Sequence, residues 1–149
     1  MGLPDILIEP TTLYRQMVEK RWAKSADVVL GVIPTGNPGK ADVVEIAEDG
    51  RVKCIRPKPD GLSTARAWIA AAWRPSFTEY LHHFLADRPA NLDTERELYL
   101  GDILSASFAE LDVCALVCDE GRFIDIGTPE DLAHEGRSSF TRPSRPLLA

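Results

Sequence analysis

Two aspartates in apolar surroundings are the residues of this chain best suited to chemistry. Asp125 lies between Ile124 and Ile126 in a run that is typical of a short strand, and Asp5 precedes apolar residues 6–8 near the other end. An ionised carboxylate in such a setting is costly unless a positive group meets it. Mg²⁺ is usually held by one or two carboxylates together with substrate phosphates. The pattern therefore predicts that Asp5 and Asp125 meet around one cation.

Simpler roles for both carboxylates stay open. Asp125 can cap the turn into a short helix that is expected over residues 128–135, where a Thr N-cap precedes a Pro at the first helical position. Asp5 can be an exposed residue near the terminus, or it can cap the helix expected after Pro10.

The composition is that of an ordinary globular domain. The chain has 149 residues, of which 44% are hydrophobic and 27% charged, so it fits one domain with a real core. Its net charge of −6 and the lack of a basic stripe argue against nucleic acid as a partner. No apolar run approaches the roughly 20 residues that a membrane span needs, and no signal peptide is visible. The three cysteines, an odd number in apolar runs, indicate reduced thiols and a cytoplasmic location.

Apolar periodicity predicts alternating strands and helices, and hence an α/β fold with a mixed β-sheet flanked by helices. Asp49-Gly50 between two β-rich runs indicates a hairpin. The expected strands cover residues 5–8, 28–33, 43–46, 51–55, 66–73, 113–118 and 123–126. The expected helices start at Pro10, Pro75 and Glu97, the first ending near Lys24 and the third near Leu111. Trp22, Trp68 and Trp73 are expected in the core, and residues 137–149 form a flexible tail rich in Ser, Arg and Pro.

The order of several short motifs resembles the second half of the sugar-phosphate nucleotidyltransferases, the family of glucose-1-phosphate thymidylyl- and uridylyltransferases. The block from Asp125 to Leu132, Asp-Ile-Gly-Thr-Pro-Glu-Asp-Leu, is the most specific element. The other matches are Leu3-Pro4-Asp5, Lys58-Pro59, and Glu97 with Leu100 and Asp102. The resemblance implies a Rossmann-like architecture, with residues 1–136 as a partial domain that holds the sugar-phosphate-binding half.

In such enzymes a nucleoside triphosphate reacts with a sugar 1-phosphate to give a nucleotide sugar and pyrophosphate. By the resemblance, Asp5 and Asp125 hold the Mg²⁺ that bridges the phosphates. Lys58 grips the sugar phosphate, Glu97 accepts hydrogen bonds from sugar hydroxyls, and Gly127 lies against the substrate. Without the resemblance, Lys58 is a solvated lysine and Glu97 is an acid in a helix first turn, where the dipole favours it.

The chain departs from the family pattern at several positions. Pro57 stands where the family usually has Glu, and Ala70 stands where a Gly is common, so Ala70 is expected to crowd the sugar. The family's glycine-rich nucleotide loop is expected before residue 1 and is not found in the sequence.

Three hypotheses follow. The first is a truncated or split nucleotidyltransferase that takes dTTP or UTP and is inactive alone. Its expected partner is a complementing N-terminal polypeptide or a further copy of the chain in a homo-oligomer. The second is a non-catalytic sugar-phosphate-binding or regulatory module. The third is a decayed fragment.

Overall fold

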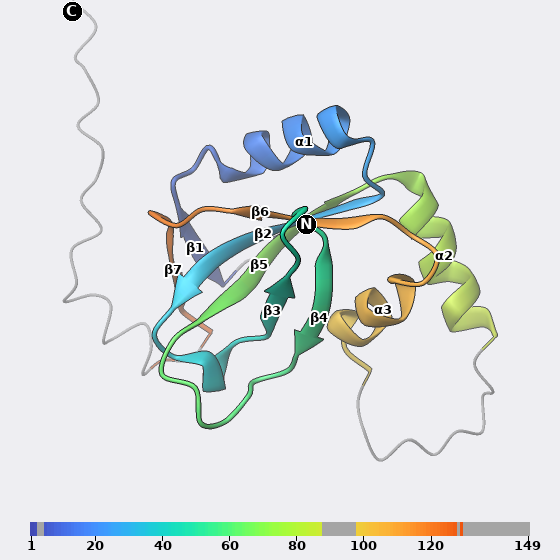
Figure 1. The fold of residues 1–149 in the computed structure, drawn as a ribbon. Coiled ribbons are helices and arrows are strands. Elements are labelled where there is room, and N and C mark those ends of the chain that lie inside the picture. The colour runs from blue at the N-terminus through green and yellow to red at the C-terminus, as the bar shows by residue number, and fades with distance from the viewer. Residues whose placement is uncertain (3–4, 88–97, 128, 130–149) are drawn as a thin grey trace, which may run out of the picture.

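Helices cover both faces of a mixed sheet, as the sequence pattern predicts (Figure 1). The computed structural model describes residues 1–2, 5–87, 98–127 and 129. The helices are α1 (Leu13–Lys24), α2 (Pro75–Ala86) and α3 (Leu100–Ser107), with one short 3₁₀ turn, η1 (Pro38–Lys40). The strands are β1 (Ile6–Glu9), β2 (Val28–Thr35), β3 (Val43–Ile46), β4 (Val52–Arg56), β5 (Ala65–Trp73), β6 (Val113–Val117) and β7 (Arg122–Asp125). Glu97 and the tail expected over 137–149 lie outside the described residues.

The described strands form two sheets. The larger has the order β4-β3-β5-β2-β6, in which β2 runs parallel to β6 and antiparallel to β5. Its central strand β2 is buried from Val28 to Ile33, which explains why those residues form a continuous apolar run. The hairpin predicted around Asp49-Gly50 is present as β3 and β4. β1 and β7 pair separately as a small antiparallel sheet.

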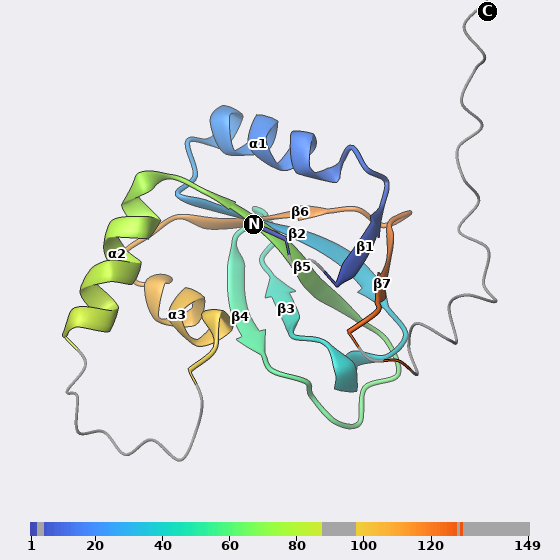
Figure 2. The same cartoon turned by 180° about the vertical axis from the view of Figure 1, so that it is seen from behind.

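Two hydrophobic clusters lie on opposite faces of the larger sheet because side chains alternate along β2. One cluster contains Phe77 of α2 and Leu104 of α3, both fully buried. The other contains Leu13 and Met17 of α1. The reverse view shows α1 on one side of the sheet and the other two helices on the opposite side (Figure 2).

A bulge in β5 changes which residues face the two clusters. The register passes from Gly31↔Ala70 to Val32↔Trp68, so Ile69 has no partner in β2. As a result Ile69 and Ala70 both pack on the α1 side, while Trp68 packs on the side of α2 and α3.

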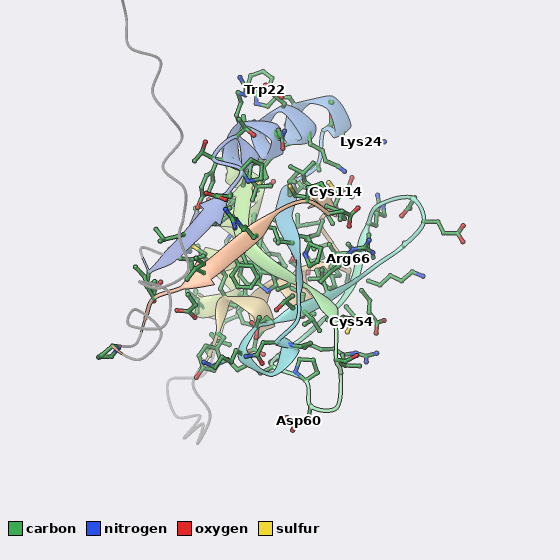
Figure 3. All side chains as sticks on the ribbon, turned by 90° about the vertical axis from the view of Figure 1, so that its left-hand side faces the viewer. Trp22, Lys24, Cys54, Asp60, Arg66 and Cys114 are labelled. Carbon is green, nitrogen blue, oxygen red and sulfur yellow. The ribbon has the colours of Figure 1, made fainter. Side chains whose placement is uncertain are left out.

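The prediction that Trp22 belongs to the core is wrong. Trp22 is 72% exposed and projects from the outer side of α1 (Figure 3). The helix buries Leu13 and Met17, and Trp22 is five positions after Met17, a rotation of roughly 140° beyond a full turn. Trp22 therefore points away from the sheet, beside the Arg21 guanidinium.

Two helix boundaries also differ from the expected ones. α1 begins at Leu13 rather than Pro10, and α3 ends at Ser107 rather than Leu111. The three cysteines are free thiols. Among the described residues no helix is long and apolar enough to cross a membrane.

Candidate functional site

The small sheet brings the two predicted carboxylates together. β1 and β7 are antiparallel, with Ile6 opposite Asp125, so the start of β1 lies beside the end of β7. The Ile126 N–H donates to the Asp5 carbonyl oxygen across 2.8 Å, which continues the pairing beyond the strands. Residues from distant parts of the sequence thus become neighbours through backbone hydrogen bonds.

Gly127 lies between the two carboxyl groups. A Cβ added there would be 3.0 Å from Oδ1 of Asp125 and 3.0 Å from Oδ2 of Asp5. The two oxygens therefore lie close to one common point, which is open because residue 127 has no side chain. The Gly127 N–H also donates to Oδ1 of Asp125 across 2.9 Å. Asp125 thus caps the turn at Gly127, the simpler role that the sequence left open. Its ionised carboxylate still has further acceptor sites for a ligand.

An ion pair fixes the other end of the small sheet. Arg122 and Glu9 are opposite each other in the register, and Nε of Arg122 lies 2.6 Å from Oε2 of Glu9. Opposite charges directly across an antiparallel pair stabilise it, although the gain is modest at an exposed position. Asp5 does not cap α1, because the N-cap of α1 is Thr12 and no side chain makes a cap hydrogen bond there.

The chemistry of this pair suits a hard cation. The two carboxylates beside Gly127 offer oxygen ligands. Mg²⁺ commonly takes only one or two carboxylate ligands from a protein, and waters and substrate phosphates complete its coordination. No third His, Cys, Asp or Glu among the described residues completes a metal-binding cluster with them. Asp5 and Asp125 would hold Mg²⁺, which would supply positive charge to bound phosphates.

Asp125 also lines a cavity of about 360 Å³ that we call the Lys58 cavity. Lys58 reaches it from the loop after β4, and Tyr99 and Leu100 reach it from the start of α3. The remaining lining residues are Met1, Ile6, Lys40, Ala41, Asp42, Trp68, Ile69, Gly101 and Phe123. The structure therefore places a lysine and one of the paired carboxylates on the same cavity.

The backbone at Lys58 adopts a conformation unusual for a residue other than glycine. Its φ is 39°, in the left-handed region, between Pro57 and Pro59. This conformation belongs to a rigid loop, since the flanking prolines fix their own φ. Lys58 is exposed, so its ammonium group can meet a ligand that enters from solvent.

Asp42 is a member of the Lys58 cavity that the sequence analysis did not identify. It lies between η1 and β3, and its carboxylate accepts the backbone N–H of Lys58. A Cβ added to Gly101 of α3 would lie 3.2 Å from Oδ2 of Asp42, so this carboxylate rests against the first turn of α3. Burial raises the pKa of Asp42, partly opposed by the Lys58 charge and N–H.

Trp68 forms part of the wall beside Asp42. Its backbone N–H donates to the Asp42 carbonyl oxygen across 3.1 Å. Its indole N–H is buried and has no hydrogen-bond partner in the described part of the chain. The hydrogen-bonding capacity of this buried N–H is therefore unmet within the described residues.

A second cavity, of about 380 Å³, shares Asp125, Lys40, Ala41 and Phe123 with the first. We call it the Arg122 cavity. It is also lined by Pro34, Thr35, Gly36, Asn37, Arg122 and Ile124. A larger hollow, of about 870 Å³, lies between α2 and α3 but has no lysine or arginine among its lining residues. The two cavities around Asp125 thus offer a phosphate a lysine or arginine, and the largest one does not.

The other residues that the sequence analysis singled out do not line the Lys58 cavity or lie outside the described residues. Ala70 is buried in the cluster under α1 and does not line the Lys58 cavity. Asp102 accepts the Tyr99 N–H across 3.0 Å and so stabilises the start of α3. Glu97 lies outside the described residues, so its role remains an expectation.

The architecture is a nucleotidyltransferase-like α/β fold. Among solved structures, the chain is similar to a Bacillus anthracis protein assigned as a glucose-1-phosphate thymidylyltransferase, in complex with sucrose, at a TM-score of 0.70 and 16% identity. It is also similar to UTP-bound UGPase from Acinetobacter baumannii, at 0.65 and 15%, and to HddC from Yersinia pseudotuberculosis complexed with GMP-PN, at 0.54 and 19%.

The alignments cover most of this chain but only part of its neighbours. They include 95%, 94% and 87% of the chain, and 55%, 51% and 50% of the respective neighbours. The chain therefore spans about half the length of the solved structures that it matches. No protein-family model and no curated protein matches the sequence.

Proposed function

We propose that this chain is the sugar-phosphate-binding half of a sugar-1-phosphate nucleotidyltransferase. The observation that carries the proposal is the meeting of the Asp5 and Asp125 carboxylates at Gly127, on the rim of the Lys58 cavity. The fold shared with the thymidylyltransferase and UGPase structures supports the same reading.

The chemistry needs positioning and charge neutralisation rather than a covalent intermediate. The sugar phosphate oxygen attacks the α-phosphorus of a nucleoside triphosphate such as dTTP or UTP, and pyrophosphate leaves. Lys58 binds the sugar phosphate as a point charge. Asp5 and Asp125 would hold the Mg²⁺, and Gly127 would leave room for it. Glu97 accepts hydrogen bonds from the sugar hydroxyls.

Turnover in this proposal also requires a nucleotide-binding part, either in one longer polypeptide or supplied as a separate one. The basis is that the chain spans about half of its structural neighbours.

The test measures pyrophosphate release from dTTP or UTP with glucose 1-phosphate and Mg²⁺, together with calorimetric binding of glucose 1-phosphate. We expect the chain to bind the sugar phosphate but to release little pyrophosphate until a nucleotide-binding part is added. Lys58→Ala should abolish binding, while Glu19→Gln on the outer face of α1 should not. Rapid pyrophosphate release by the chain alone would disprove the need for another part.

The calorimetric binding of glucose 1-phosphate also distinguishes the proposed enzyme half from the alternative, a non-catalytic binding module. Such a module binds sugar phosphate with little dependence on Asp5, and Asp5→Ala would leave both binding and its response to Mg²⁺ unchanged. In the proposed enzyme half, Asp5→Ala removes the enhancement of binding by Mg²⁺. A chain that binds no sugar phosphate at all would contradict both functions.

A further inference from the structure

Asp42 lines the Lys58 cavity, and the proposed function assigns no role to it. Its backbone is fixed because its carbonyl oxygen accepts the Trp68 N–H from β5. Its carboxylate is confined by the loop that carries Lys58 and by the first turn of α3 at Gly101. Three separate parts of the fold therefore hold this side chain in one position on the cavity wall.

The carboxylate keeps unused hydrogen-bonding capacity. An ionised carboxylate accepts about four hydrogen bonds, and the described residues supply it with the Lys58 N–H. Burial raises the pKa of Asp42, because its charged form has lost solvent that protein donors do not fully replace. A ligand that brings further O–H donors into the cavity would stabilise the charged form.

The position of Asp42 relative to Lys58 indicates which part of a ligand it meets. The two residues line the same cavity, and Asp42 is bonded to the backbone of Lys58, so anionic and cationic side chains lie next to each other. A phosphate is attracted to the lysine and repelled by the aspartate. A neutral polyol attached to that phosphate has the donors that a carboxylate binds well.

We propose that Asp42 is a specificity-determining residue that accepts hydrogen bonds from the ring hydroxyls of the ligand, while the Lys58 ammonium group binds its phosphate. The inference rests on the proposed function, because it takes the Lys58 cavity as the sugar-phosphate site. Asp42 then selects phosphates that carry a hydroxylated ring over phosphates that do not.

The experiment compares glucose 1-phosphate with methyl phosphate, which has the phosphate but no ring. Binding is followed by the indole N–H resonance of Trp68 in ¹H–¹⁵N spectra of the full chain, assigned with Trp68→Phe. We expect Asp42→Ala to weaken glucose 1-phosphate binding by about tenfold, the loss typical of a hydrogen bond to a charged group. Methyl phosphate binding should not weaken, because the variant removes a charge that repels phosphate. Asp42→Asn keeps the shape and one acceptor oxygen of the side chain, so its affinity for glucose 1-phosphate should lie between those of wild type and Asp42→Ala. Because this variant is nearly isosteric, it tests the role of Asp42 even if Asp42→Ala folds poorly.

Each outcome has a distinct meaning. Lys58→Ala should weaken both ligands, and Glu19→Gln, an equal charge change in an exposed ion pair with Arg15, should weaken neither. If Asp42→Ala weakens both ligands equally, Asp42 only positions the Lys58 loop and the specificity role is wrong. If it weakens neither, Asp42 has no role in binding, although the proposed function survives. If the wild-type chain binds neither ligand, the proposed function fails as well.

Discussion

The Ile126 N–H donates to the carbonyl oxygen of Asp5 across 2.8 Å, and this one backbone contact connects the two acids of the candidate site. Because it continues the antiparallel pairing of β1 with β7, it fixes the carboxyl group of Asp5 relative to that of Asp125. The site therefore depends on the register of a small sheet that contributes little to the core. Changes to the site can consequently be separated from changes to the stability of the larger sheet.

Gly127→Ala should weaken Mg²⁺ binding by about tenfold or more, the range seen when groups that orient metal ligands are altered. The added Cβ would lie 3.0 Å from one oxygen of each aspartate, so at least one carboxylate must move. The measurement is Mg²⁺ affinity by calorimetry, or Mn²⁺ affinity by electron paramagnetic resonance. Gly39→Ala is the matched control, since a Cβ there meets nothing within 4 Å. Equal affinities for the two variants would mean that residue 127 does not border the cation.

Lys58→Asn should unfold at a higher denaturant concentration than Lys58→Ala, although both lose the ammonium group. The φ of 39° at this position is strained for alanine, whereas asparagine tolerates the left-handed region. We expect a difference of about 1 kcal/mol in the free energy of unfolding, measured by urea titration. The opposite order would indicate that the loop relaxes to an ordinary φ once the lysine is removed.

The meeting of Asp5 with Asp125 could be predicted because each acid adjoins an apolar run, where an ionised carboxylate needs a positive partner that the two can share. Asp42 could not be found in this way. In the sequence it follows Ala41 and precedes a strand, like many surface acids. Its burial comes from the Lys58 loop and from α3, both distant in the sequence.

Which sheet face each β5 residue occupies also could not be predicted from the sequence, because it depends on contacts with another strand. Strict alternation would put Ile69 and Ala70 on opposite faces, but the bulge puts both on the α1 side. A bulge depends on the register with the partner strand, and a local pattern does not encode that register. Ala70 therefore packs under α1 and does not line the Lys58 cavity, and the expectation that it crowds a sugar stays a prediction.

Gly31→Ala should destabilise the fold by about 1–3 kcal/mol through overpacking. A Cβ at this position in β2 would lie 2.7 Å from Sδ of Met17 and 3.2 Å from Cδ2 of Leu13. Both side chains are fully buried, so they have little space into which to move. Urea denaturation measures the loss, and Gly36→Ala is the control because its added Cβ meets nothing within 4 Å. Glucose 1-phosphate binding by the folded Gly31→Ala chain should be retained, because α1 and the Lys58 cavity involve different side chains.

Asp42→Asn should increase the free energy of unfolding at pH 7 and change it little at pH 3. Burial raises the pKa of Asp42, so the folded chain binds a proton at this site more tightly than the unfolded chain does. Such a group contributes stability that is fully present below its unfolded pKa, about 3.9, and that is lost as pH rises through the folded pKa. Asparagine has no charge to desolvate and keeps an acceptor for the Lys58 N–H, so it avoids this loss.

The measurement for Asp42→Asn is a pair of denaturation curves against wild type at each pH, with Glu19→Gln as the control for an exposed acid. A gain in stability that is equal at both pH values would show that desolvation of the Asp42 carboxylate is not its cause. A gain confined to pH 7, together with weaker binding of glucose 1-phosphate, would show that the chain keeps a destabilising charge in its cavity for the sake of ligand recognition. Residues that serve a site commonly cost stability in this way.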